Sequence, residues 1–499
     1  MRNSSRSRAR SILVAVLTAL AALIVGVMSS ITSVVTASIG LAAFNAIIVP
    51  GTGTQHPQNV PNYLENAVNY YVVPGGDCVL DAPMGACPAT TYGVNYYANF
   101  WPIPLPGWGG LQGQKWNVSV ANGVENLEIA YLNIPGGDTV TIFGYSQGAT
   151  VANKFKAAHP QDSSNLGPDE PLTNYFFIGD PQRPSGGFFE RFGFLGNVPI
   201  LDAQFGEPSP TDTCDGGDRI CATDFALMYD GVADFPQWLL NPVAVLNAVA
   251  GFQYIHGTYL APDADDPATE TPYGYTPEEV QGYITAAQAD CTAKNYCQHV
   301  DGSDTIYITL PARYLPIYQP FIDLGDATGT SALIVPIVDF ASPFTQTIIE
   351  TAYDRTDYSK PQQGTLLPPA TFNPVQTGVD LVKDIPVAID MALTPGRTPL
   401  PGSPPLPDTA STLSDSSTNT STNEDVATTT KLLDGKPLTR LGLIAKPNEG
   451  ISATGTDGSS TTGPVGTALK DFHPVRDTVK AVSGAVSKAL GKDDDSSSQ

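Results

Sequence analysis

The sequence predicts an α/β fold in which a mainly parallel sheet is covered by helices on both faces. Short apolar runs of β-forming residues alternate with segments whose apolar residues recur at helical spacing. Such alternation is typical of parallel sheets, whose strands are buried on both sides. No period of about 20 to 50 residues is visible, which argues against a repeat fold. The chain contains 47 glycines and 44 prolines among 499 residues, so long loops are expected between the elements.

The elements are expected in the following order. Strands are predicted at residues 43–50, 138–144, 174–180 and 224–230, and helices at residues 61–72, 118–131 and 149–158. Within residues 118–131 one apolar helical face is formed by Val120, Val124, Leu127 and Tyr131. In a sheet of this kind, functional sites form at the carboxyl ends of the strands.

Composition divides the chain into three segments. Residues 1–36 form an export segment, and residues 37–395 carry all six cysteines and nearly all aromatic residues, as a globular domain does. Residues 396–499 are rich in Pro, Ser and Thr and cannot bury a core. Four valines between 475 and 486 recur at helical spacing in this tail. They indicate either a short surface helix against membrane or wall, or a weakly ordered polar tail.

The N-terminus has the pattern of a signal peptide or an N-terminal membrane anchor. Arginines at positions 2, 6, 8 and 10 precede the apolar run 12–28, and no other charged residue follows until Glu65. The pattern predicts an exported protein of the cell envelope, attached to the membrane through this segment or released from it by cleavage.

The charge balance argues against a nucleic-acid partner. The chain has 25 Lys and Arg against 49 Asp and Glu, a net charge of −24. Phosphate binding requires clustered cations, which this composition does not provide.

The cysteines fall into three local pairs: Cys78 with Cys87, Cys214 with Cys221, and Cys291 with Cys297. An even number in an exported chain predicts disulfides, although six cysteines allow about fifteen connectivities. A zinc site is the competing interpretation. It is disfavoured because the chain has no C-x-x-C motif, and we expect neither a metal nor another cofactor.

Ser146 is the candidate nucleophile. The segment TVTIFGYSQGATVANKF places it in a G-x-S-x-G motif between a predicted strand and a predicted helix. A sharp turn of this kind leaves no room for side chains at Gly144 and Gly148, and it exposes the hydroxyl at a helix N-terminus, which favours developing negative charge. An ordinary turn serine is the alternative.

A serine nucleophile needs a base and an acid that orients it. Of five histidines, His56 precedes the serine, His159 ends the helix after it, His299 adjoins a cysteine loop and His473 lies in the tail. His256 follows an apolar helix and is the predicted base.

Three aspartates are candidates for the acid. Asp234 and Asp230 both lie in YDGVADFP, and Asp218 lies in CDGGDRIC. Asp234 is preferred because it lies in a turn after a predicted strand, and Asp218 and Asp230 remain open.

Two families resemble this chain. GYSQGA looks like the nucleophile motif of cutinases, and CDGGDRIC is similar to their acid loop, although His256 is too far from it for the cutinase pattern. The PE-PPE domain serine hydrolases of mycobacteria resemble the chain more widely, from about residue 48 to 358. The shared segments are GTGTQHPQNV, GYSQGA, GDPQRPSGG, YDGVADFP, NAVAGFQYIHGTY and LPARYLPIYQPF. The resemblance implies a cutinase-like α/β-hydrolase fold and an esterase, thioesterase or acyltransferase that acts on long acyl chains.

The same resemblance suggests the oxyanion hole. VPGTGT is similar to the turn that supplies one donor in cutinases, which implies Thr52 beside the backbone N–H of Gln147. A plain glycine turn is the alternative.

The predicted export segment or anchor stands where proteins of this family usually carry a helical PE or PPE region, and this arrangement resembles the envelope acyltransferases of polyacylated trehalose lipids. Residues 300–395 are rich in Leu, Ile, Pro and Tyr, and are either an apolar cover over the cleft or ordinary core. The predicted function is acyl transfer between trehalose glycolipids, with an acylated glycolipid or fatty acyl ester as partner. A lipase that releases free fatty acid and a catalytically idle lipid-binding protein are the alternatives.

Overall fold

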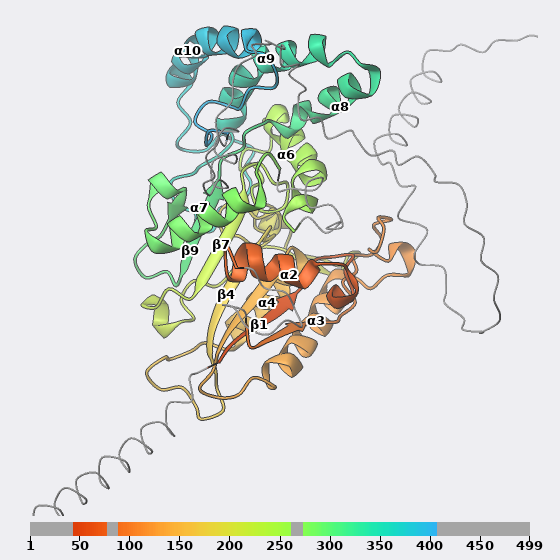
Figure 1. The fold of residues 1–499 in the computed structure, drawn as a ribbon, viewed down its shortest axis with the longest axis vertical. Helices are drawn as coiled ribbons and strands as arrows, with labels where there is room; N and C mark the ends of the chain where they lie inside the picture. The colour runs from red at the N-terminus through yellow and green to blue at the C-terminus, as the bar shows by residue number, and fades with distance from the viewer. Residues whose placement is uncertain (1–42, 77–87, 261–272, 407–499) are drawn as a thin grey trace, which may run out of the picture.

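A seven-stranded sheet forms the centre of the molecule (Figure 1). The computed structural model describes residues 43–76, 88–260 and 273–406. The strand order is β2-β1-β3-β4-β7-β9-β8, and neighbouring strands run parallel except for β8 against β9. The strands are β1 (Phe44–Val49), β2 (Thr90–Gly93), β3 (Thr139–Tyr145), β4 (Leu172–Ile178), β7 (Ala222–Leu227), β8 (Cys297–Gln298) and β9 (Thr305–Leu310). A separate short hairpin pairs β5 (Asn197–Val198) with β6 (Ala203–Gln204).

Helices cover both faces of this sheet. On one face lie α3 (Trp116–Tyr131) and α4 (Gln147–Ala158). On the other lie α2 (Tyr63–Ala67), a π-helical turn (Val68–Val72) and α7 (Pro277–Ala289). Alternate side chains of a strand point to opposite faces, so neighbouring residues of β1 belong to different cores: Ile47 packs with the first group and Ile48 with the second. The predicted α/β fold is therefore confirmed.

Two predicted elements differ in detail. The helix expected at 61–72 is divided into α2 and the π-helical turn. The strand expected at 224–230 runs from Ala222 only to Leu227, and the next residues form a turn. This earlier end matters for the site, because it moves Asp230 from a strand into a loop at the carboxyl edge of the sheet.

Four of the later helices of the chain form a helical end of the molecule. The short helix α5 (Phe188–Arg191) instead packs its Phe189 against Trp116 of α3. The helical end is formed by α6 (Pro242–Tyr254) and, after β9, by α8 (Gln319–Thr328), α9 (Ser331–Glu350) and α10 (Pro374–Leu393). Figure 1 shows α8, α9 and α10 beyond α6, at the opposite end from α3. The region 300–395 thus contains both a core strand, β9, and this helical layer. The contacts described do not place the layer over Ser146.

Residues beyond the predicted domain end at 395 still contact the domain. The N–H of Thr398 donates to Asp339 at 2.9 Å, and the N–H of Leu400 donates to the Arg313 carbonyl at 2.8 Å. The export segment and the tail from residue 407 lie outside the described residues.

Two of the predicted disulfides are confirmed. The sulfurs of Cys214 and Cys221 are 1.97 Å apart, and those of Cys291 and Cys297 are 2.03 Å apart. The third predicted pair, Cys78 with Cys87, lies outside the described residues.

Candidate active site

Ser146 lies in the turn between β3 and α4. Its φ of 54° and ψ of −119° are strained for a residue with a side chain. The turn is held because the Ser146 N–H donates to the Ile178 carbonyl of β4 at 3.1 Å. The hydroxyl is thereby raised at the carboxyl edge of the sheet, next to the N-terminus of α4.

The two glycines of the motif are required by close backbone contacts. A Cβ on Gly144 would lie 2.7 Å from the Ala149 Cα, and one on Gly148 would lie 2.2 Å from the Val49 carbonyl oxygen. These distances are shorter than van der Waals contact. The turn therefore needs glycine on both sides of the serine, as the sequence suggested.

His256 follows α6 and faces the serine. Its Nε2 lies 2.9 Å from the Ser146 Oγ, and the residue is only 7 % exposed. Gly179 leaves room for the ring, because a Cβ there would lie 2.8 Å from the imidazole Cε1. The Tyr145 hydroxyl donates to the His256 carbonyl and holds the backbone. The structure thus brings together the two residues predicted as nucleophile and base.

Asp230 lies behind the histidine. Its two carboxylate oxygens are 3.1 and 3.0 Å from the His256 Nδ1, and the side chain is fully buried. The Val232 N–H donates to Oδ1 and the Tyr259 hydroxyl donates to Oδ2, both at 2.9 Å. A carboxylate held in this way keeps the proton on Nδ1 and leaves Nε2 free to accept the serine proton.

The preference for Asp234 is corrected by this geometry. The Asp234 carboxylate binds the Arg355 guanidinium at 2.9 and 3.1 Å and accepts the Tyr229 N–H at 2.8 Å. These contacts use both of its oxygens, whereas the His256 Nδ1 lies against the Asp230 carboxylate. The physical reason is the early end of β7, which places Asp230, and not Asp234, beside the imidazole.

Asp218 is excluded by its place in the fold. It precedes β7, whereas Asp230 follows it, and β7 runs parallel to β4, which in turn runs parallel to β3. A six-residue strand spans about 20 Å, so the disulfide loop lies at the amino edge of the sheet and Ser146 at the carboxyl edge.

The other described histidines have partners elsewhere. The His56 ring contacts the Asn95 amide oxygen, and the His159 ring contacts the Glu128 carboxylate. The His299 ring contacts the Ser303 carbonyl. His473 lies outside the described residues.

The two segments predicted to supply the oxyanion donors both lie next to the serine in the fold. Gln147 is the first residue of α4, and N–H groups of a first helical turn have no intrahelical acceptor. Its side chain is fixed, because Nε2 donates to the Asn99 carbonyl and Oε1 accepts the Ser119 hydroxyl, both at 2.9 Å. A Cβ on Gly51 would lie 3.2 Å from the Ser146 Cβ, so the loop that carries Thr52 passes beside the nucleophile. The role of Thr52 as a donor stays a prediction.

A model of the PE-PPE domain matches residues 87–354, which is more than half of the chain. The chain belongs to the PE-PPE domain family. Three similar proteins come from Mycobacterium tuberculosis. "Esterase PE16" is 27 % identical over 68 % of this chain and 54 % of its own length. "Uncharacterized PPE family protein PPE42" is 31 % identical over 50 % of this chain and 36 % of its own. "Diacyltrehalose acyltransferase Chp2" is 25 % identical over 63 % of this chain and 76 % of its own.

The PE-PPE chain therefore spans only about half the length of the esterase and about a third of the PPE protein. Among solved structures it resembles a cutinase-like protein from Cryptococcus sp., with 19 % identity and a TM-score of 0.23, over 38 % of this chain and 79 % of that chain.

Tyr259 is a site residue of this PE-PPE domain that sequence reasoning missed. Its hydroxyl donates to Asp230 and accepts the Leu227 N–H at 2.9 Å, so it ties the acid to the last residue of β7. Burial is the main cause that raises the pKa of the Tyr259 hydroxyl well above its ordinary value, and the negative charge of Asp230 raises it further. The hydroxyl therefore stays protonated and can donate. Its position three residues after the histidine, in HGTY, was the available signal.

A closed ring of polar contacts supports the turn that carries Asp230. Tyr229 has a φ of 69°, in the left-handed region. Its N–H donates to Asp234, and its hydroxyl donates to Glu350 at 2.8 Å. Arg355 joins Asp234 to Glu350, at 2.9 and 2.8 Å. Asp234 therefore stabilises the turn, and the residues that complete the ring come from the end of α9 and the loop after it.

Aromatic side chains border the histidine. The Phe252 ring is stacked 5.9 Å from the His256 ring, and Trp108 meets Phe252 edge-on at 6.2 Å. These rings make one side of the site apolar, which suits a hydrocarbon chain.

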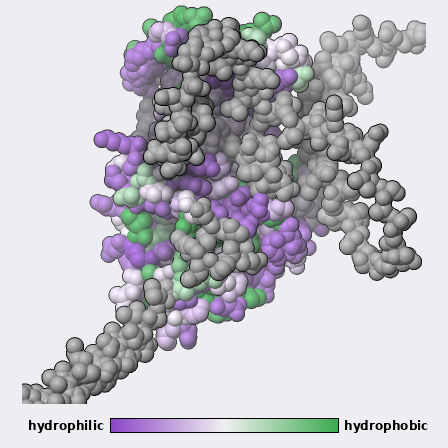
Figure 2. Space-filling view, viewed as in Figure 1, coloured by the Kyte–Doolittle hydropathy of each residue, from purple (hydrophilic) through white to green (hydrophobic). Residues whose placement is uncertain are grey.

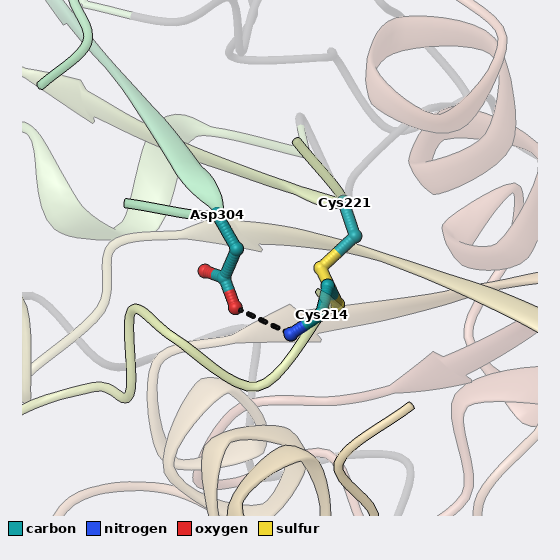
Figure 3. Close-up of side chains that lie close together, drawn as sticks. All are labelled: Cys214, Cys221 and Asp304. Carbon is teal, nitrogen blue, oxygen red and sulfur yellow. Dashed lines mark hydrogen bonds between the residues drawn. A yellow bond between two sulfur atoms is a disulfide. The ribbon is translucent and has the colours of Figure 1, made fainter. Parts of the chain in front are cut away.

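One cluster resembles a metal site in its residue types. Figure 3 shows Cys214, Cys221 and Asp304 close together. The two sulfurs are bonded to each other, so neither is a thiolate ligand. Asp304 accepts the Cys214 N–H at 3.2 Å and pairs with the buried Lys156 ammonium at 2.7 Å. The cluster anchors the disulfide loop to β9.

Proposed function

We propose that this PE-PPE domain protein is a serine acyltransferase or esterase of the cell envelope that acts on long-chain acyl esters through an acyl-enzyme on Ser146. One observation carries the proposal: Ser146, His256 and Asp230 form a continuous chain of contacts at 2.9 and 3.0 Å. The serine lies on a strained turn at a helix N-terminus, where negative charge on a reacting oxygen is stabilised.

In the first half-reaction, the Ser146 Oγ attacks the ester carbonyl carbon while its proton moves to the His256 Nε2. Asp230 stabilises the resulting imidazolium by accepting the Nδ1–H. The Gln147 N–H and the predicted Thr52 donor would bind the oxyanion. The intermediate then collapses, the C–O bond to the alcohol breaks, and His256 returns the proton to the leaving alcohol oxygen.

In the second half-reaction, the attacking group decides the product. His256 removes a proton from water or from a sugar hydroxyl, the new oxygen attacks the acyl carbonyl, and Ser146 leaves as the alcohol. Water is present at about 55 M, so transfer requires a bound acceptor of high effective molarity. We infer transfer to a trehalose glycolipid as the finer function, supported by the similarity to the diacyltrehalose acyltransferase.

An envelope location is supported by two observations. Two disulfides are present in the described part of the chain, and disulfides persist in oxidising compartments. The basic and apolar N-terminal pattern predicts export.

The first experiment measures hydrolysis of p-nitrophenyl esters of increasing acyl length by the full chain. We expect turnover that rises with chain length and is lost in Ser146→Ala and His256→Ala. Equal turnover in the native protein and Ser146→Ala would contradict the proposal. Absence of turnover in all proteins would favour an idle lipid-binding protein.

The second experiment separates transfer from hydrolysis. An acylated trehalose donor and a second trehalose lipid that has a free sugar hydroxyl as acceptor are incubated with the protein, and the products are quantified by mass spectrometry. We expect acylated acceptor to form faster than free fatty acid. Free acid as the sole product over a range of acceptor concentrations would identify an esterase.

A further inference from the structure

The outer faces of α9 and α10 carry apolar stripes that nothing in the described residues covers. On α9 the exposed members are Leu333, Ile337, Phe340 and Ile348. On α10 they are Val375, Val379, Val382, Ile385, Ile389 and Leu393. Their spacing of mostly three and four residues places each set on one side of its helix. We call these two sets together the outer apolar face.

The inner sides of both helices are already used. α9 buries Val338 and Ile349, and α10 buries Ala388 and Met391. Between the helices, the Thr347 hydroxyl donates to Asp384 at 2.7 Å. The outer apolar face is therefore additional to the surface that packs the helices against the domain.

The ionisable side chains of α9 are not part of the outer apolar face. The 20 residues of α9 contain two ionisable side chains, Asp339 and Glu350. Asp339 is buried and accepts the Thr398 N–H at 2.9 Å, and Glu350 pairs with Arg355 at 2.8 Å. On α10, the exposed Lys383 is neutralised by Asp380 at 2.9 Å. Asp384 accepts the Thr347 hydroxyl, which leaves Asp390 as the exposed carboxylate of α10 without an ion pair among the described residues. For a chain with a net charge of −24, the surface here carries few unpaired charges.

The apolarity of α9 exceeds what its packing requires. By length and composition alone α9 could cross a membrane, with a mean hydropathy of 1.5 over an 18-residue window, yet only 28 % of that window is buried. A core helix of a water-soluble domain would be mostly buried. Two aligned sets of exposed apolar side chains are typical of an interaction site, and long helical faces of this kind with few unpaired charges fit the surface of a lipid layer.

Helix α6 connects this end of the molecule to the active site. α6 packs against α9 and ends two residues before His256. It exposes Leu246 and Val249, and its Phe252 is stacked on the His256 ring. Figure 1 shows α6 between the α9–α10 layer and the sheet, and Figure 2 shows hydrophobic surface at the α9–α10 end.

We propose that the outer apolar face docks on the surface of an uncharged lipid layer and holds α6 and the catalytic cleft beside it. Long-chain esters would then pass from the layer to Ser146 along α6 without crossing water. The inference rests on the proposed function only in naming these esters as the substrate. Docking itself is independent of Ser146.

The test uses the full chain with phosphatidylcholine vesicles that contain a small fraction of phosphatidylcholine bearing a diazirine in its acyl chain. After illumination, labelled peptides are identified by mass spectrometry. We expect label in 331–350 and 374–393, whether or not the N-terminal run 12–28 is also labelled. Label confined to residues 12–28, or spread evenly over the surface, would overturn the proposal.

A matched pair of triple variants completes the test. Leu333→Gln, Ile337→Gln and Val382→Gln alter side chains that are 70, 68 and 65 % exposed. The control consists of Ile129→Gln, Leu132→Gln and Ile200→Gln. These side chains are 56, 73 and 67 % exposed and lie at the C-terminal end of α3 and in the loop of the β5–β6 hairpin. We expect the first triple to lower α9–α10 labelling and turnover of a vesicle-borne long-chain ester at least 10-fold, and the control to change neither.

Two further readouts identify the cause of any other result. Hydrolysis of soluble p-nitrophenyl butyrate without vesicles should be equal in both triple variants. If the native protein hydrolyses p-nitrophenyl esters of no acyl length, the proposed function fails, while labelling still reports docking. The native oligomeric state is measured by light scattering. A vesicle-free dimer that dissociates only in the first triple variant would assign the face to a second copy and overturn the lipid proposal.

Discussion

Helices α4 and α10 both carry apolar residues at helical spacing, yet they place them in opposite environments. On α4, Ala149, Ala152 and Phe155 are fully buried against the sheet. On α10, Val375 and Leu393 are 76 and 78 % exposed. The comparison teaches that apolar periodicity identifies which residues share a helical face. Whether that face is buried or exposed depends on the tertiary structure around the helix. Substitutions in the sheet region should therefore change catalysis or folding, and those on the outer faces of α9 and α10 should change lipid contact.

The largest effect is expected in the sheet region for Asp230→Asn. The amide keeps the shape of the carboxylate but favours the wrong tautomer of His256, so turnover of a soluble ester should fall about 10⁴-fold. Circular dichroism and thermal unfolding should confirm that the variant is folded. A loss of less than about 10-fold would show that Asp230 does not orient the base.

The next effect concerns Gly148→Ala. The added Cβ would lie 2.2 Å from the Val49 carbonyl oxygen, which requires the turn at Ser146 to move. We expect a loss of more than about 3 kcal/mol in the free energy of unfolding, measured with urea, and a loss of activity. An active, fully stable variant would contradict the close packing described for this turn.

Asp234→Asn should have an intermediate effect, on stability more than on catalysis. It removes the buried charge that pairs with Arg355 at 2.9 Å, at a cost of about 3 kcal/mol in the free energy of unfolding. Turnover at low temperature should stay within about 10-fold of native, because Asp230 and His256 keep their contact. If Asp234→Asn lowers turnover more than Asp230→Asn in folded protein, the assignment of the acid must be reversed.

The smallest effect is expected in the helical end, where the same Gly→Ala change has the opposite sign. Gly378 lies on the exposed side of α10, and a Cβ there meets nothing within 4 Å. Gly378→Ala should stabilise the protein by up to about 1 kcal/mol, because alanine favours the helix. Destabilisation would mean that the outer side of α10 is covered in the free protein.

The sequence predicted the parts of the site that depend on local chemistry. Ser146 is identified by glycines on both sides and by the strand and helix that flank it, and the cysteine pairs close loops of only six and seven residues. His256 followed from the order of residues along the chain. The serine motif and the two cysteine pairs are each specified within a few residues of sequence, whereas His256 lies 110 residues from Ser146 and was found by its order along the chain.

The sequence could not identify the acid or the environment of α9 and α10. The choice between Asp230 and Asp234 depends on where β7 ends and on Arg355, which lies more than a hundred residues away and binds one of the two carboxylates. Burial of region 300–395 also depended on tertiary contacts: β9 enters the sheet, while α9 and α10 pack on each other and leave one side of each exposed.

The most direct test of the central claim is the intact mass of the full chain after reaction with a fluorophosphonate ester. We predict one covalent adduct per chain, located on the peptide that contains Ser146, formed much more slowly in Asp230→Asn and absent in Ser146→Ala. An adduct on a different residue, or one that persists in Ser146→Ala, would contradict the account.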